Sequence, residues 1–459
     1  MLKIPFAAGV SNRTAYGLPE ARLVNLFAET NQGDAVQSVR LPRPGLVEYD
    51  DNGSGPVRGL FQSDGVFGGA IFEVSGTTLY KDGSSVGTIS GSGPVRFAAS
   101  SLELVIVAAP SAYLYDGSTT ALIDDTDLPN VVDVTFLAGR FVYAQSGGDQ
   151  FYWSGTNDAG SIDGLSYSSA EASADAIIGL AEISDTLFIF GGKTVEVWSP
   201  TGNDDDPFQR SGASRLMRGC AARDSIVAMD NTAFWVGEDC VVYRAESAPI
   251  RVSTHGIEAA LRRCTDLASA TAFEAPIEGH KFYVLAIPGE GSFAYDVATQ
   301  QWSEWDTYGA MTFRGGCAIQ YGSLLLVGDN ATGQIWEMRP GVYADDGDPI
   351  TFLASAFIPN DGGPQRCNNI VLQGARGVGL ATGQGSDPLV EMRYSDDQGH
   401  SWSTWRQASL GAVGEYTRRA VWKQCGLIRE PGRLVEIRCT DPVLATMNAL
   451  LVNSDRPYG

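Results

Sequence analysis

Short apolar runs separated by Gly-rich or polar turns dominate the chain, and apolar residues at helical spacing are rare. In the middle of the chain one phrase recurs. A short apolar run and a turn are followed by a second run, usually ending in an aromatic residue. The paired runs are 70–74 with 78–80, 104–107 with 112–115, 140–143 with 151–153, 187–190 with 195–198, 233–236 with 241–243, 281–285 with 293–295, and 323–327 with 334–336. Such pairs predict β-hairpins and therefore an all-β protein.

The spacing of the repeat indicates a β-propeller. Successive copies start roughly 33 to 48 residues apart, a range that brackets propeller blades of about 40 to 50 residues. A small twisted sheet cannot cover both of its faces alone, whereas sheets stacked around a ring bury both faces and leave short edges. We therefore expect a propeller of about seven blades; a large sandwich or a set of unrelated hairpins is the alternative.

The flanks differ from this repeat. Residues 1–50 contain Pro42 and Pro44, which disfavour a central strand and suggest an extended N-terminal arm. The propeller is placed at 51–342 and a C-terminal β-rich domain at 343–459, with an Asp- and Gly-rich linker at 345–349. A strand from residues 1–50, or from the C-terminal region, is expected to complete the last blade. Residues 255–264 have helical spacing and predict a short helix between the fifth and sixth blades.

The charge is strongly acidic and unevenly distributed. The net charge is −22, whereas proteins that grip nucleic acid by neutralising phosphates are expected to be basic. The stretch from Arg393 to Arg438 has eight basic and five acidic residues, so it carries +3 and the rest of the chain −25. This asymmetry suggests opposed interaction faces. The acidity also argues against an anionic membrane as a partner.

The cysteines indicate no cofactor or metal site. There are seven of them, widely spaced and without a CxxC pair. Scattered buried thiols made in a reducing cytoplasm fit this pattern better than a disulfide framework or a zinc site. No metal ligand set, cofactor motif or membrane-spanning run is predicted, and the acidic clusters are interpreted as solvated turns, with adventitious calcium as the alternative.

One local motif is specific. Ser395, Asp397, Gly399 and Trp402 resemble the Asp box, S-x-D-x-G-x-[ST]-W, of sialidases and other propellers. In that hairpin turn the Ser and Asp side chains bind the turn backbone, the Gly takes a positive φ, and the Trp packs beneath. A sialidase would repeat the box and add an arginine cluster, and neither is evident. A structural turn is therefore the preferred interpretation.

A second group is basic. Arg418 and Arg419, with Lys423 and Arg429, form a candidate partner interface. On a strand, Tyr416, Arg418, Ala420 and Trp422 would share one face. A contact with a protein is preferred over a contact with phosphate.

Two short stretches resemble catalytic motifs, but neither has the structural context that its motif requires. The sequence 191–194 resembles the end of a Walker A loop, but a strand follows where a helix is required. The sequence 83–87 matches a nucleophile elbow, but it lies in a Gly/Ser hairpin. No catalytic residues are assigned and the protein is not expected to be an enzyme.

Several blocks together resemble the packaged-DNA stabilisation proteins of short-tailed phages. They are 23–29, 43–46, 57–60, 78–80, 93–96, 177–180, 190–191, 199–202, 257–262, 421–423 and 426–429. The resemblance spans nearly the whole chain, and Asn25, Gly45 and Gly59 look like turn residues of the family pattern.

The resemblance implies a tail accessory factor made in the host cytoplasm and located in the virion tail. Such a protein is expected to form a homo-oligomeric ring, a hexamer, below the portal or adaptor protein. The ring would retain packaged DNA, let it pass through the lumen, and contact the tail needle and spike or fibre proteins. The alternatives are a carbohydrate-binding or glycosidase-like tail propeller and a peptide-binding propeller scaffold.

Overall fold

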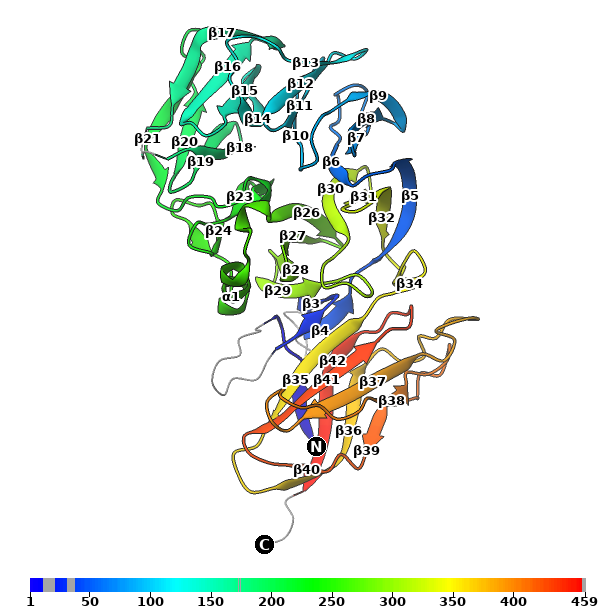
Figure 1. The fold of residues 1–459 in the computed structure, drawn as a ribbon. Coiled ribbons are helices and arrows are strands. Elements are labelled where there is room, and N and C mark those ends of the chain that lie inside the picture. The colour runs from blue at the N-terminus through cyan, green and yellow to red at the C-terminus, as the bar shows by residue number, and fades with distance from the viewer. Residues whose placement is uncertain (11–20, 31–37, 172, 174, 456–459) are drawn as a thin grey trace.

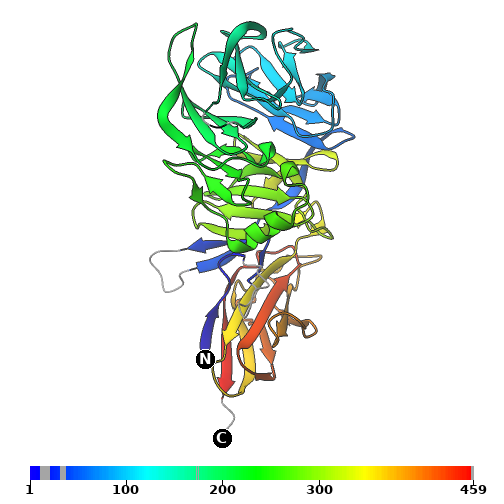
Figure 2. The same cartoon turned by 60° about the vertical axis from the view of Figure 1, so that its left-hand side comes forward.

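The computed structural model describes residues 1–10, 21–30, 38–171, 173 and 175–455, and its ordered elements are mostly β-strands. Figures 1 and 2 show a propeller stacked on a smaller β-sandwich, with both termini at the sandwich end. The all-β prediction is confirmed. One α-helix occurs in the described ranges, α1 (His255–Arg263), at the predicted place; two short 3-10 helices, η1 (Arg223–Ser225) and η2 (Leu267–Ser269), accompany it.

The propeller is built from antiparallel four-stranded units. Five of them use consecutive strands and form separate sheets. Their strands are β6 (Val57–Phe61), β7 (Phe72–Ser75), β8 (Thr78–Lys81), β9 (Ser84–Thr88); β10 (Arg96–Ala99), β11 (Leu104–Ala108), β12 (Ser111–Tyr115), β13 (Thr120–Leu122); β14 (Val131–Leu137), β15 (Arg140–Gln145), β16 (Gln150–Gly155), β17 (Asp158–Ser169); β18 (Ile177–Ile183), β19 (Thr186–Gly191), β20 (Val195–Pro200), β21 (Phe208–Leu216); and β22 (Val227–Met229), β23 (Thr232–Val236), β24 (Val242–Arg244), β25 (Ile250–Arg251).

The remaining propeller strands form two further units. Strands β30 (Gly315–Tyr321), β31 (Leu324–Asp329) and β32 (Gly333–Arg339) join β5 (Gly45–Gly53) in a sixth separate four-stranded sheet of the described chain. Strands β26 (Thr271–Ile277), β27 (His280–Ile287), β28 (Gly291–Asp296) and β29 (Gln301–Trp305) form a meander that continues into a nine-stranded sheet. In every unit, the paired runs predicted from the sequence are the two middle strands.

An N-terminal strand completes the β30–β32 sheet. Strand β5 runs antiparallel to β32, with Leu46 opposite Met338 and Val47 opposite Glu337. A strand within residues 1–53 thus closes this sheet, as one of the two sequence-based options expected. Gly45 and Gly59 are strand residues and not turn residues, which corrects the sequence interpretation. A Cβ on Gly45 would lie 2.1 Å from the Ala344 carbonyl oxygen, and one on Gly59 would lie 2.7 Å from Val95 Cγ2.

Apolar side chains are buried between successive units. Seven such clusters occur among the described residues, and each draws on two neighbouring units. For example, Phe72 and Val74 of β7 pack with Leu104 and Ile106 of β11. The last cluster joins Leu326 of β31 to strand β6 and to Ile71, just before β7, so the burial runs around the ring.

The sandwich has two sheets around a single core. One sheet is the continuation of the β26–β29 meander through β2 (Leu23–Val24), β35 (Phe352–Pro359), β41 (Gly432–Cys439), β37 (Leu389–Ser395) and β38 (Arg406–Ser409). The other contains β3 (Leu26–Thr30), β4 (Ser38–Pro42), β42 (Met447–Asp455), β36 (Gln365–Gly374) and β39 (Val421–Lys423), with β1 (Leu2–Pro5) and β40 (Leu427–Ile428). One cluster fills the space between the two sheets.

The expected N-terminal arm is largely part of these sheets. Strand β1 pairs with β42, β2 lies between β29 and β35, and β3 and β4 form a hairpin beside β42. The prolines are accommodated because Pro42 ends β4 and Pro44 precedes β5. Residues 11–20 and 31–37 of the predicted arm lie outside the described residues. The predicted linker is a small hairpin, β33 (Ala344–Asp345) with β34 (Asp348–Pro349), whose Asp346 and Gly347 both have positive φ.

Candidate functional site

The Asp-box residues form the turn between β37 and β38. Gly399 N donates to Ser395 Oγ (2.8 Å), and Ser395 Oγ donates to Asp397 Oδ1 (2.7 Å). Asp397 also accepts the backbone N–H of Ser401 (2.8 Å) and its hydroxyl (2.5 Å). The Ser401 and Ser395 hydroxyls hold the pKa of the Asp397 carboxyl below its usual range. Gly399 has a φ of 98°, as predicted. The Ser and Asp side chains bond within the turn, as a folding device would.

The aromatic residues of this turn stack on arginines. The Arg393 guanidinium lies 4.2 Å from the centroid of the Trp402 ring and 4.7 Å from that of Trp405. Arg438 covers Trp405 from 4.0 Å. Trp402 is half-buried and packs against a cation, an arrangement that stabilises the turn by a cation–π contact.

The sequence analysis did not predict that an ion pair links this turn, through Arg433, to the loop at residues 425–427. Asp396 forms an ion pair with the buried Arg433, at 2.6 and 2.8 Å. Arg433 also donates to the carbonyl oxygens of Cys425 and Leu427 and stacks on Tyr394. The alternation of β41 could have marked Arg433 as an unusual polar residue near apolar neighbours.

The four residues of the candidate partner interface are exposed in the structure. Arg418 and Arg419 lie in the loop between β38 and β39, Lys423 ends β39, and Arg429 follows β40. The prediction that residues 416–422 form one strand is wrong. Strand β39 begins only at residue 421, and the preceding loop turns at Gly411 and Gly414, which have positive φ.

The loop carries exposed apolar side chains as well as charge. Tyr416 is 70% exposed and Val413 is 64% exposed, beside Arg418 and Arg419. Within the described part of the chain, neither arginine has an ion-pair partner at 4.0 Å or less. Tyrosine and arginine are enriched in protein interfaces, so the composition of this loop fits a contact with a protein.

The net acidic charge lies outside residues 351–455, which make up most of the sandwich. Residues 351–455 have ten basic and ten acidic residues, so the net charge of −22 is carried by the rest of the chain. Several acidic residues of the propeller are in exposed turns, and the Asp204 side chain is 97% exposed. The charge asymmetry noted in the sequence is therefore a difference in net charge between the propeller and the sandwich.

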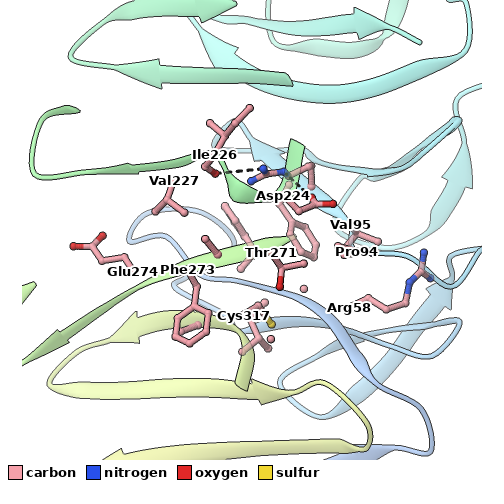
Figure 3. Close-up of a pocket in the computed structure, with 18 of the residues that line it drawn as sticks. Arg58, Pro94, Val95, Asp224, Ile226, Val227, Thr271, Phe273, Glu274 and Cys317 are labelled. Carbon is pink, nitrogen blue, oxygen red and sulfur yellow. Dashed lines mark hydrogen bonds and ion pairs between the residues drawn. The ribbon is translucent and has the colours of Figure 1, made fainter. Parts of the chain in front are cut away.

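The centre of the propeller holds a polar cavity of about 360 Å³ (Figure 3). Its lining comes from β6, β10, β22, β26 and β30, the first strands of five units, and from η1. Arg96 reaches across it, donates to the carbonyl oxygens of Arg223 and Ile226, and lies 3.4 Å from Asp224. Arg223 donates to Val132 O (2.8 Å) and pairs with Asp224 (2.9 Å). These bonds tie the inner strands together and place charge-paired side chains around the cavity.

A buried polar cluster joins the propeller to the sandwich. Arg43 is fully buried and pairs with Asp345, with Nη2 2.7 Å from Oδ2. Arg43 also donates to Asn25 Oδ1 (2.9 Å) and to the carbonyl oxygen of Asp306 (3.0 Å). Asn25 has a φ of 52°, as a turn residue of the family pattern would, and its amide donates to Thr351 O. The sequence analysis singled out the blocks around Asn25 and Arg43, but it did not predict that these two residues contact each other.

The remaining motifs lie in β-hairpins, as interpreted from the sequence. Residues 191–194 connect β19 to β20, and residues 83–87 belong to the β8–β9 hairpin. His255, His280 and His400 lie in different elements. In the part of the chain that the structure describes, no helix has the length and apolar character needed to cross a membrane.

Comparison with known proteins assigns the family. Residues 2–343 match the family model described as Bacteriophage P22 Gp10, beta-propeller, and residues 351–455 match Bacteriophage P22 Gp10, beta-sandwich. The chain belongs to the P22 Gp10 family. It is 24% identical over 421 residues to the tail hub protein gp10 of Salmonella phage P22, covering 84% of this chain and 85% of that protein.

Membership of the P22 Gp10 family indicates a structural protein of a phage tail, a hub or nozzle subunit of the virion, and not an enzyme. The carbohydrate-recognition and peptide-scaffold alternatives are not favoured. Among solved structures, the designed protein Ika8 is similar at 16% identity and a TM-score of 0.41, covering 69% of this chain and 99% of that one. The extracellular domain of a B. thetaiotaomicron two-component system is similar at 12% identity and 0.44, covering 76% and 45%.

Proposed function

We propose that this P22 Gp10 family member assembles into a closed ring of identical subunits, a hexamer, below the portal or adaptor protein. The ring retains packaged DNA and forms part of its exit conduit, with the tail needle and spike or fibre proteins as further partners. The acidic propeller faces or rims the conduit, and the basic loop of the sandwich contacts a neighbouring tail protein. The observation that supports this arrangement is that residues 351–455 have no net charge, so the net negative charge lies in the rest of the chain.

The charge distribution suits a conduit. Tight binding of DNA requires basic groups that neutralise phosphates, and a wall that bound DNA strongly would hinder its exit. An acidic wall repels DNA, and salt screens that repulsion over a distance of about 10 Å. The exposed arginines of the neutral sandwich are then free to bind a protein partner.

The propeller is proposed to have seven blades, and the β26–β29 meander is the unit that completes the count. Its supporting contacts are apolar: Tyr283 and Trp302 pack with Phe234 of the β22–β25 sheet. On the other side, Phe282 and Trp305 pack with Trp336 of β32. The proposed domains are 51–342 for the propeller and 343–459 for the sandwich, with residues 1–50 contributing strands to both.

The assembly state tests the ring. The purified protein is measured by light scattering and negative-stain microscopy, alone and with the portal–adaptor complex. Recruitment into a closed ring at the tail end is expected. A monomer that ignores the portal and binds a glycan array would overturn the proposal.

The basic loop is tested by removing its charge. In the double variant Arg418→Ala/Arg419→Ala, assembly should weaken by about tenfold or more while the melting temperature stays unchanged, since exposed residues contribute little to folding. Lys193→Ala is the matched control, because Lys193 is exposed on the propeller. Equal assembly of both variants would exclude the loop as the contact.

The conduit is tested by charge reversal. Lysine in place of Asp204, Asp205 and Asp206 in assembled particles should slow DNA ejection and change its salt dependence. Unchanged ejection would contradict the role of the acidic turns while leaving the ring itself intact.

A further inference from the structure

Two cysteines of the sandwich lie against one another, although they are far apart in the sequence. Cys367 is in β36, and Cys425 is in the turn between β39 and β40. Cys425 N donates to Cys367 O (3.0 Å), and Cys367 N donates to Gly426 O (2.8 Å). Both side chains belong to the sandwich core, and each is near enough to shift the pKa of the other. Each of the seven cysteines, all of them described, is a free thiol in this structure.

The surroundings of the pair favour a thiolate on one sulfur. Arg406 Nη1 lies 3.7 Å from Cys425 Sγ, and Arg433 donates to the carbonyl oxygen of the same residue. The adjacent Cys367 side chain, followed by the two arginines, lowers the pKa of Cys425 to about 6, and the proximity of Cys425 raises the pKa of Cys367.

The other buried thiols differ from this pair. Cys220 donates to the carbonyl oxygen of Ala222 (3.1 Å), and burial raises its pKa to about 12. Burial also raises the pKa of Cys439 to about 12. Thiols of this kind are inert to oxidants, because the thiolate is the nucleophile. They serve as internal controls within the same chain.

A path for a small oxidant is present beside the pair. A cavity of about 320 Å³ is lined by Arg366, Cys367, Asn368, Gln424, Gly426 and Leu427. Gln424 and Gly426 both have positive φ, so an irregular turn, rather than a regular strand, flanks Cys425. The cavity reaches Cys367 and the two residues on either side of Cys425, Gln424 and Gly426.

We propose that Cys367 and Cys425 are a redox pair that is assembled reduced and is converted by peroxide to a reversible disulfide, which links β36 to the β39–β40 turn. A virion protein is made in a reducing cytoplasm and then leaves the cell, where disulfides persist. The bond would fasten the turn next to Lys423 and Arg429, two residues of the proposed partner interface.

The chemistry balances with hydrogen peroxide as the oxidant. The Cys425 thiolate attacks one peroxide oxygen, the O–O bond breaks, and a sulfenic acid forms as hydroxide leaves and takes up a proton. The Cys367 sulfur then attacks the Cys425 sulfur; the S–O bond breaks, the S–S bond forms, and the departing hydroxide takes the Cys367 proton. Two thiols lose two electrons in total, and one peroxide becomes two waters.

The test uses the full-length protein, reduced and then treated with hydrogen peroxide. After alkylation and tryptic digestion without reductant, mass spectrometry should find peptide 367–376 joined to peptide 424–429. Dithiothreitol should reverse the link, and the link should raise the melting temperature by about 5 °C or more. Cys220 and Cys439 should stay reduced during the peroxide treatment and should therefore be found alkylated. Absence of the link, or faster oxidation of these two controls, would overturn the proposal.

Single variants assign the attacking sulfur. In Cys367→Ser the sulfenic acid on Cys425 has no partner and should be trapped by dimedone, at least about tenfold more than Cys367 is in Cys425→Ser. Equal labelling would contradict the assignment of Cys425. If either variant fails to fold, dimedone competition in the unmodified protein answers the same question, because the reagent should label Cys425 and not Cys367.

Discussion

The propeller and the sandwich are made of the same kind of strand but bury their apolar surface differently. In the propeller, seven clusters of described residues lie between successive units, so each unit depends on its two neighbours. In the sandwich, one cluster is shared by both sheets. The propeller therefore resembles a closed repeat, in which nearest-neighbour contacts dominate, and the sandwich resembles a single globular core.

Charge separates the two regions in the same way. Residues 351–455 of the sandwich have equal numbers of acidic and basic residues, and cross-strand pairs such as Arg393 with Glu436 hold several of them together. The propeller carries the net acidity, much of it in exposed turns. The repeat thus presents a field of one sign, while the single core offers individual basic side chains for specific contacts.

The largest effect is expected where the two regions meet. Replacing Arg43 by methionine leaves the buried Asp345 carboxylate without its partner, and such losses cost about 3–5 kcal/mol. Urea denaturation should show this loss in tryptophan signals of both regions, because Arg43 contacts residues from both.

The matched control removes both charges. Arg43→Met/Asp345→Leu should recover part of the stability, since no buried charge then lacks a partner. A loss of less than about 1 kcal/mol in the single variant would contradict the view that this cluster couples the regions.

The sequence predicted the propeller well because its middle strands have local signals. Pairs such as 187–190 and 195–198 are apolar, short and separated by a turn, and they coincide with β19 and β20. The first and last strands of each unit have weaker patterns, and in five units the first strand lines the polar cavity.

The junction could not be predicted, because its partners are remote in sequence. Strand β2 has two residues and pairs with β29 and β35, roughly 280 and 330 positions away. No local periodicity marks such a strand. Gly45 and Gly59 were misjudged for a similar reason: a close approach between distant backbones selects glycine as effectively as a turn does.

The candidate site was predicted unevenly. The Asp box is a local motif whose bonds span seven residues, so its geometry followed from the sequence. The strand expected at 416–422 was wrong because Gly411 and Gly414 turn the chain before β39. The ion pair between Arg433 and Asp396 could not be predicted, because it depends on how β41 packs against the Asp-box turn.

The second effect tests the propeller alone. Glu73 is 1% exposed, and burial raises the pKa of its carboxyl to about 7. A folded-state pKa above the unfolded value means that stability is greatest at low pH and falls as the pH rises from about 4.5 to 7. Glu73→Gln should therefore stabilise the protein by about 1–3 kcal/mol at pH 8 and change little at pH 4.5. Parallel pH profiles of the melting temperature would contradict this.

The third effect tests the contact between β27 and the N-terminal strand β3. His280 Nδ1 lies 2.8 Å from Asp296 Oδ2, and Nε2 lies 2.7 Å from Glu29 Oε2. The carboxylates, chiefly that of Asp296, raise the pKa of His280 to about 9. The charged imidazole should therefore contribute its full stabilisation below pH 6.5 and lose it as the pH rises through 9.

Replacing His280 by glutamine removes this dependence. The free energy of unfolding should fall by about 1–2 kcal/mol at pH 6 and should not change above pH 9. The expected change is small because Glu29 is partly exposed and solvent screens its charge. Unfolding measured at both pH values checks it. A loss of equal size at both would show that packing against Phe27, and not charge, is what His280 provides.

The smallest effect is confined to the sandwich. Gly399 has a φ of 98°, so Gly399→Ala should cost about 1 kcal/mol in backbone strain at the Asp-box turn. Gly363→Ala is the control, because no atom lies within 4 Å of its added Cβ. Hydrogen exchange should accelerate in β37 and β38 and remain unchanged in the propeller. Faster exchange in the propeller as well would mean that the nine-stranded sheet, which runs from β26 to β38, transmits local strain across the junction and that the two regions do not respond independently.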